Sequence, residues 1–146
     1  MNPEDFLDTA ATLLLNARES DQRSCVSRAY YSVYHMLREV LLNTLPLTLL
    51  QSSGMGSKNQ ISHDKLPSAL KNSSDPAIAE IGEQLLMLNV ERTRADYQLD
   101  RPVVKNNARV QYENATDLRD DLKAYGLSKL AQALKSDLEK TFRASP

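Results

Sequence analysis

Residues 27–35 read Ser-Arg-Ala-Tyr-Tyr-Ser-Val-Tyr-His and bring an arginine, three tyrosines and a histidine into one helical segment. Side chains seven positions apart on an α-helix differ by only about 20° in direction, so Arg28 and His35 lie on one stripe. Ser24, Tyr31 and Arg38 share or border this stripe, which we call the polar stripe. The opposite face offers apolar residues that we predict to enter the core: Val26, Ala29, Tyr30, Val33, Leu37, Val40 and Leu41.

The polar stripe combines a permanent cation with a side chain that exchanges protons near neutral pH. Guanidinium donors suit phosphate, and an imidazole acts as general base or general acid. Such a pair can cleave a phosphodiester beside a 2′-hydroxyl without a metal. One imidazole takes the hydroxyl proton, the arginine stabilises charge at phosphorus, and a second donor protonates the leaving oxygen. Each chain has one histidine on this stripe, so we expect two copies to meet across a dimer; the alternative is a structural polar patch or a dimer seam.

A second pair of charges, Arg92 and Asp96, lies on a helix predicted further along the chain. Arg92 falls on the apolar seam of that helix, where a buried cation needs a partner. Asp96 follows four residues later, at pairing distance. The spacing favours a structural ion-pair network linking this helix to the one with the polar stripe. The alternative is that Arg92 or Asp96 borders the site and orients His35.

Hydrophobic periodicity predicts the helices that must position these residues. Asn2 can cap a first helix that ends near Ser20, and Asp21 a second that runs to about Leu45, before Pro46. Further elements are expected as follows: a loop over 46–62, a short helix over 63–72, a long helix opened by Asp75-Pro76, a long helix over 105–125 and a last helix over 128–143.

The helix predicted over 105–125 and the last helix are separated by a predicted break. Gly126 suits a left-handed C-terminal cap, and Ser128 can cap the helix that follows. No run alternates long enough to predict a sheet. The chain is therefore predicted to be all-α, an up-and-down four-helix bundle with one or two additional short helices. We expect one domain over residues 1–146, with its core in 3–125.

Composition narrows the function classes. Eighteen basic and nineteen acidic residues among 146 give a net charge of −1, unlike proteins that coat nucleic acid by bulk electrostatics. One cysteine and two histidines leave little for a zinc site, and we expect no metal or cofactor. The acidic start and the lack of a long apolar run predict a soluble, cytoplasmic protein that does not enter a membrane.

Two motifs in the right order give the chain a resemblance to a known superfamily. Residues 28–35 (Arg-Ala-Tyr-Tyr-Ser-Val-Tyr-His) and residues 92–97 (Arg-Thr-Arg-Ala-Asp-Tyr) resemble the signature helices of the HEPN superfamily, the higher eukaryotes and prokaryotes nucleotide-binding domain. They are closest to a small bacterial and archaeal branch. The resemblance covers roughly residues 3–125.

The resemblance implies a helical bundle that dimerises so that the two stripe-bearing helices face one cleft. Many such proteins are metal-independent RNases that act as toxins, in phage defence or in RNA processing, and some have an antitoxin partner. Transferred by position, the active residues would be Arg28 and His35. Tyr31 and Ser24 would line the cleft, Arg38 would hold the RNA backbone, and Arg92 and Asp96 would support the site.

Other functions stay open. The same cleft could hold a nucleotide, an RNA end or a protein partner without cutting it. Ala29 stands where the family's characterised nucleases usually have a polar residue, and together with the near-neutral charge it favours this second hypothesis. A third reading is a dimeric scaffold that binds no ligand.

Overall fold

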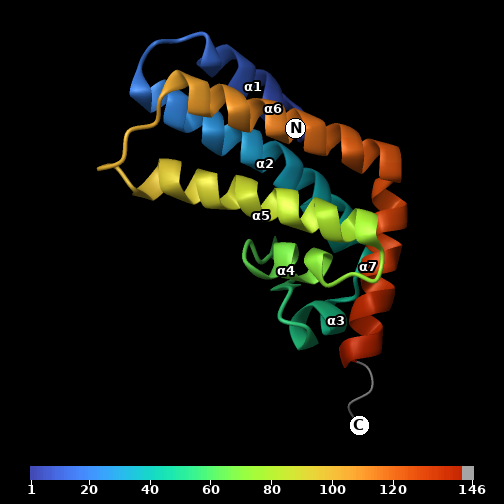
Figure 1. The fold of residues 1–146 in the computed structure, drawn as a ribbon. Helices are drawn as coiled ribbons and strands as arrows, with labels where there is room; N and C mark the ends of the chain where they lie inside the picture. Colours follow the sequence, from blue (N-terminus) through green and yellow to red (C-terminus); the bar gives the residue numbers. More distant parts are fainter. Residues whose placement is uncertain (143–146) are drawn as a thin grey trace. The chain divides into compact units, whose positions relative to one another are not determined.

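The computed structural model describes residues 1–142, which form seven helices and one short hairpin (Figure 1). The elements in chain order are α1 (Asp5–Leu14), α2 (Glu19–Thr44), α3 (Leu47–Ser52), β1 (Gly56–Ser57), β2 (Gln60–Ile61), α4 (Lys65–Lys71), α5 (Pro76–Tyr97), α6 (Lys105–Tyr125) and α7 (Leu127–Phe142). The prediction of an all-α helical bundle is confirmed.

The chain divides into two compact units, and α2, α5 and α6 each run through both of them. The first unit consists of Met1–Met36 and Met87–Asp120. The second consists of Leu37–Leu86 and Asp121–Pro146, described as far as residue 142. The single domain that the sequence predicts over residues 1–146 stays a prediction.

In the first unit, α1 and parts of α2, α5 and α6 pack together through small and apolar side chains. An ion pair of 3.7 Å joins Arg119 on α6 to Glu4 just before α1, and Arg23 on α2 donates to the Ala95 carbonyl on α5. Small residues at the contacts let the helix backbones lie close together. The buried residues of this unit include Leu7, Ala10, Ala29, Ala95, Ala108, Ala115 and Leu118.

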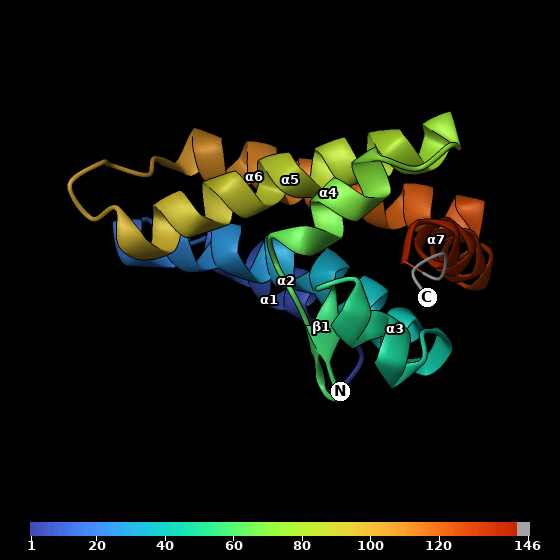
Figure 2. The ribbon, with the colours of Figure 1, turned by 90° about the horizontal axis from the view of Figure 1, so that it is seen from below.

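In the second unit, α7 contacts both α3 and α4, and the hairpin lies beside α3 (Figure 2). The Tyr125 hydroxyl at the end of α6 donates to Asp75 Oδ2 at 2.6 Å, which ties that helix to the start of α5. The other Asp75 oxygen accepts from the Ala77 amide at 2.9 Å, so the predicted cap of α5 is present. These two hydrogen bonds hold the pKa of Asp75 below its usual range.

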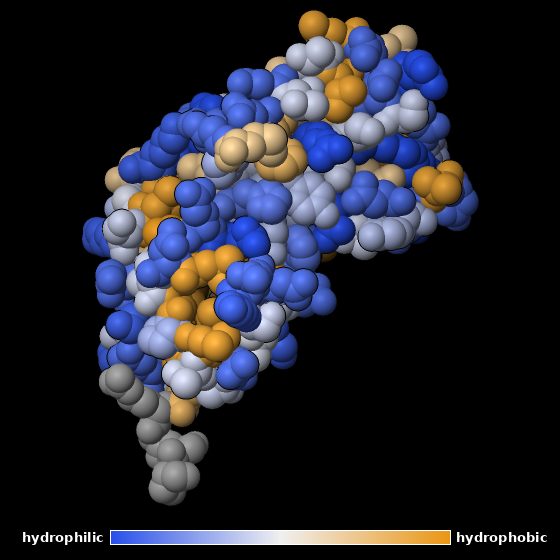
Figure 3. Space-filling view, turned by 180° about the vertical axis from the view of Figure 1, so that it is seen from behind, coloured by the Kyte–Doolittle hydropathy of each residue, from blue (hydrophilic) through white to orange (hydrophobic). Residues whose placement is uncertain are grey.

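The apolar seam predicted for the helix that carries Arg92 is buried. All six seam positions of α5 are shielded from solvent: Ile78, Ile81, Leu85, Leu88, Arg92 and Ala95. On α7 the same holds for Leu130, Leu134 and Leu138, whereas Phe142 is partly exposed. On the face drawn in Figure 3, hydrophobic residues form separate patches within a mostly hydrophilic surface.

The first helix is shorter than predicted, because α1 ends at Leu14 and not near Ser20. The buried Gln22 side chain donates to the backbone carbonyl of Asn16, which holds the chain in a turn just beyond the helix. Ala17, which lies within the predicted range of this helix, is beyond its observed end and is exposed. The second helix ends at Thr44, within one residue of its predicted limit, but it begins at Glu19, so Asp21 lies inside its first turn instead of capping it.

Residues 46–62 are not a continuous loop as predicted. Leu49 and Leu50 are buried, and this anchors α3 directly after Pro46. The chain then forms a hairpin of two strands with two residues each, in which Gly56 pairs with Ile61. A Cβ at position 56 would lie 2.0 Å from the Gln60 carbonyl oxygen, so this hairpin requires glycine. Elements this short carry too few residues for a periodicity to be read.

The predicted break between α6 and α7 is a single residue. Gly126 has a φ of 99°, as expected for a left-handed cap, and its carbonyl accepts from the Leu130 amide. Helix α7 therefore starts at Leu127, and Ser128 lies inside its first turn instead of capping it. The helix is described to residue 142; its predicted end at residue 143 lies outside the described residues.

Gly82 marks a close approach between α5 and α4. A Cβ added there would lie 2.6 Å from the Lys71 backbone nitrogen and 2.8 Å from Leu70 Cβ. We expect Gly82→Ala to lower the free energy of unfolding by about 1–3 kcal/mol, because backbone atoms must shift to make room. Urea denaturation followed by circular dichroism measures this. An ordinary helical Gly→Ala change is stabilising, so a rise in stability would contradict the close packing.

Candidate functional site

Helix α2 carries the polar stripe, and the structure places three of its members together in the first unit. Arg28 is exposed, while Tyr31 and His35 are half-buried. The predicted inner face of α2 is buried except for Val40, which is half-buried. Because this apolar face fixes the rotation of the helix, the polar stripe must lie on its outer side.

Phe6 on α1 brings Arg28 and His35 to one aromatic ring. The Arg28 guanidinium carbon lies 5.7 Å from the centroid of the Phe6 ring. The His35 ring stacks on Phe6 with centroids 5.1 Å apart and an interplanar angle of 16°. Phe6, Ala10 and Leu13 are spaced four and three residues apart, which indicates an apolar face of α1 but not which helix that face meets. Phe6 is therefore a site residue that sequence reasoning missed.

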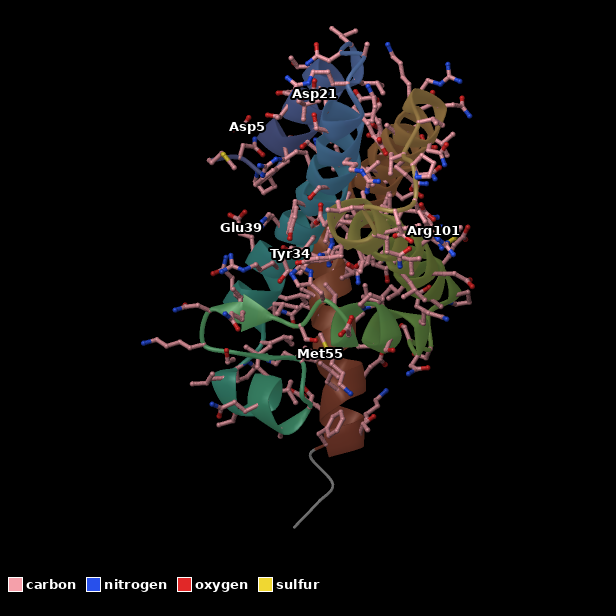
Figure 4. The ribbon with its side chains drawn as sticks, turned by 90° about the vertical axis from the view of Figure 1, so that its left-hand side faces the viewer. Asp5, Asp21, Tyr34, Glu39, Met55 and Arg101 are labelled. Atoms are coloured by element: carbon pink, nitrogen blue, oxygen red, sulfur yellow. The ribbon has the colours of Figure 1, made fainter. Side chains whose placement is uncertain are left out.

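The His35 imidazole is held by two further rings. Tyr31 stacks against it at 5.7 Å and Tyr34 meets it edge-on at 5.2 Å. Figure 4 labels Tyr34, which is buried on α2. Aromatic contacts of this kind favour defined ring geometries, so they fix the plane of the imidazole. The imidazole held in this way is still half-exposed, and histidine is the side chain that exchanges protons near neutral pH.

Arg92 on α5 supports the tyrosines from inside the first unit. Its guanidinium carbon lies 5.1 Å from the Tyr30 ring centroid and 5.8 Å from that of Tyr31. Its Nη2 donates to Asn89 Oδ1 at 2.6 Å, and its Nη1 lies 3.8 Å from Asp96 Oδ2. The predicted pairing with Asp96 is thus present, and Arg92 is only 8% exposed.

Asp96 completes the link between α5 and α2. The Ser27 hydroxyl on α2 donates to Asp96 Oδ2 at 3.4 Å. Burial raises the pKa of Tyr30 above its usual range, and the Arg92 charge opposes the rise only in part. Tyr30 therefore stays a neutral packing residue beneath Arg92. The connected set runs from Asp96 through Arg92 and Tyr31 to His35.

The two remaining predicted site residues have other surroundings. Ser24 is exposed on α2, one turn before Arg28. Arg38 belongs to the second unit, where its Nη2 donates to the Asn59 carbonyl at 2.6 Å in the turn between β1 and β2. The Asn59 carbonyl accepts one hydrogen bond from Arg38, but it carries no negative charge, so the charge of the Arg38 guanidinium is not neutralised.

Cys25 lies in the core and not in the site. Burial raises the pKa of its thiol to about 11, so it stays protonated at neutral pH. Among the described residues, no group of three histidine, cysteine, aspartate or glutamate side chains could hold a metal ion. The helices described here include none with an apolar stretch long enough to span a bilayer.

No family model, curated protein or solved structure matches this chain. The candidate site therefore rests on geometry alone. It consists of an exposed arginine and a ring-held histidine on one helix face, with Phe6 in contact with both. Within residues 1–142, the Arg28 guanidinium contacts the Phe6 ring and has no carboxylate partner. All five of its N–H donors remain available to an oxyanion.

Proposed function

We propose that this protein is a metal-independent endoribonuclease of the HEPN type, with Arg28 and His35 as catalytic residues. The observation that carries the proposal is the pairing of an exposed, uncompensated arginine with a half-exposed histidine beside the same Phe6 ring. A permanent cation and a proton carrier close together are the groups that attack by a 2′-hydroxyl requires.

The reaction begins with proton transfer from the ribose 2′-hydroxyl to a neutral His35. The 2′-oxygen attacks phosphorus, and the Arg28 guanidinium stabilises the negative charge that develops on the phosphoryl oxygens. The 5′-oxygen of the next nucleotide leaves with a proton from a second imidazole. The products are a 2′,3′-cyclic phosphate and a free 5′-hydroxyl, so the reaction consumes no water in this step.

The second imidazole comes from a second copy of the chain in this proposal. The polar stripe carries one histidine, and acid and base must act on opposite sides of phosphorus. A two-fold axis beside α2 would double both His35 and Arg28 and gather positive charge locally on a protein with a net charge of −1. The functional unit is then a homodimer, and a partner antitoxin would act by covering this surface.

Product chemistry tests the proposal directly. With EDTA present, we expect the purified protein to cut single-stranded RNA and to leave DNA of the same sequence intact. The RNA products should carry 2′,3′-cyclic phosphate ends, detected by mass spectrometry. Substrates with 2′-O-methyl groups should resist cleavage, because the nucleophile is blocked. Cleavage of DNA, or 5′-phosphate ends on the RNA products, would contradict the mechanism.

A non-catalytic binding module is the second candidate, and one observation favours it. Three aromatic rings surround the His35 imidazole, a setting that also suits a packed structural histidine. Arg28 would then hold a phosphate group of RNA or of a nucleotide without chemistry. A gel shift with RNA that stays intact at protein excess identifies this case.

A further inference from the structure

The first unit contains a solvent-open pocket on the opposite side of α2 from the polar stripe. Its volume is about 270 Å³, and it lies between α2, α5, the loop that follows α5, and α6. Val26 on α2 forms part of its wall. Val26 precedes Arg28 by two residues and His35 by nine. At about 100° per residue, its side chain therefore points to the side of α2 opposite both of them. The pocket is thus separate from the candidate catalytic site.

Two hydrogen-bonding residues of α2 hold the loop side of this pocket in place. Glu19 accepts from the Val103 amide at 2.9 Å and pairs with Arg23 at 3.1 Å. Arg23 in turn donates to the carbonyls of Ala95, Gln98 and Arg101. The loop carbonyls are therefore satisfied by the protein, and the pocket wall is formed before a ligand binds.

The charged groups of the pocket favour an oxyanion. Arg94 gives one donor to Glu91 Oε1 at 3.1 Å, which leaves four of its five N–H groups for a ligand. The Arg101 side chain, labelled in Figure 4, is exposed and lines the pocket. Within residues 1–142 its guanidinium has no hydrogen-bond or ion-pair partner. Two guanidiniums against one carboxylate leave a net positive site, and forked donors match a phosphate group.

The other polar groups favour hydroxyls on the same ligand. Asn107 and Gln111 are four residues apart on α6, so both amides face the pocket one turn apart. Each amide both donates and accepts, and the Glu91 carboxylate accepts, which is the pattern that sugar hydroxyls complete. The volume lies below the roughly 300–1,000 Å³ typical of drug-sized ligands, so the ligand must be small.

We propose that this pocket binds a small hydroxylated phosphate monoester, such as a sugar phosphate. Arg94 and Arg101 hold the phosphate, and Asn107, Gln111 and Glu91 hold the hydroxyl groups. The carbon skeleton lies against Val26. The proposal does not depend on RNA cleavage, because none of these residues belongs to the polar stripe.

Ligand titration followed by amide-resolved NMR tests the proposal, with ribose 5-phosphate, inorganic phosphate and succinate as probes. We expect ribose 5-phosphate to bind most tightly and to shift the amide signals of Val26, Ala95 and Val103. Arg101→Ala should weaken this binding at least about tenfold, since a charge-assisted contact is lost. Arg109→Ala removes an exposed arginine from α6 outside the pocket and should leave binding unchanged.

Three results would overturn the proposal. Ribose 5-phosphate could leave the three amide signals unmoved, or Arg101→Ala could bind it as well as the wild type does. Succinate or inorganic phosphate binding as tightly as ribose 5-phosphate would show that the site does not recognise a hydroxylated phosphate ester. His35→Ala should keep ribose 5-phosphate binding, so failure of the nuclease proposal is distinguishable from failure of this one.

Discussion

Replacing His35 with alanine is expected to slow RNA cleavage by at least about 100-fold, because the change removes both the general base and the general acid of a dimeric site. Arg28→Ala should cause a loss of similar size by removing the charge that stabilises the transition state. Rates of cleavage of a labelled RNA in EDTA, at saturating and at low substrate, measure both effects. Each variant should keep its helical circular dichroism, because Arg28 is exposed and His35 is only half-buried.

A charge-matched control separates catalysis from bulk electrostatics. Arg109→Ala removes an exposed arginine of α6 that bonds only to Asn106 in the described chain, and it should cut RNA at the wild-type rate. The comparison also detects a contaminating nuclease, whose activity would persist in every variant. RNA cleavage at the wild-type rate by His35→Ala would contradict the mechanism, whatever the other variants do.

The sequence predicts the long helices well because their signals are redundant. In α5, the Asp75-Pro76 start and the apolar seam agree, and the observed helix follows them. The predicted C-terminal end of α1 is wrong. The chain leaves the helix where the Gln22 side chain donates a hydrogen bond to the Asn16 carbonyl, a contact that the sequence pattern does not indicate. The prediction of a loop over residues 46–62 is wrong because α3 depends on two buried leucines and the hairpin on the close approach of Gly56 to Gln60. Neither feature produces a periodic pattern in the sequence.

The sequence predicts which site residues share a face of one helix, but not the contacts between helices. Spacing along α2 correctly places Arg28, Tyr31 and His35 on one outer stripe, and spacing along α5 pairs Arg92 with Asp96. Phe6 enters the site from another helix, and periodicity carries no information on such a contact. The ring stacking that orients His35 is equally invisible in the sequence, since it depends on rotamers and helix packing.

Arg92→Ala is expected to lower the free energy of unfolding by about 3 kcal/mol, the largest stability effect of a single charge that we predict for this chain. The guanidinium is buried, and it contacts two tyrosine rings, Asn89 and Asp96. Alanine leaves a cavity beneath Tyr30 and removes the hydrogen bond that Arg92 donates to Asn89 Oδ1. Urea denaturation of wild type and variant, with the m-value compared as well as the midpoint, measures the loss.

Arg92→Met separates the contribution of packing from that of charge. Methionine fills much of the same volume and packs well against aromatic rings, so it should recover a substantial part of the stability lost in Arg92→Ala. It cannot pair with Asp96 or place a cation near the Tyr31 ring, which is one of the two rings that stack on His35. We therefore expect Arg92→Met to fold but to cleave RNA more slowly, with kcat reduced more than KM is changed. A variant with near-wild-type stability and unchanged kcat would show that Arg92 positions neither tyrosine nor histidine.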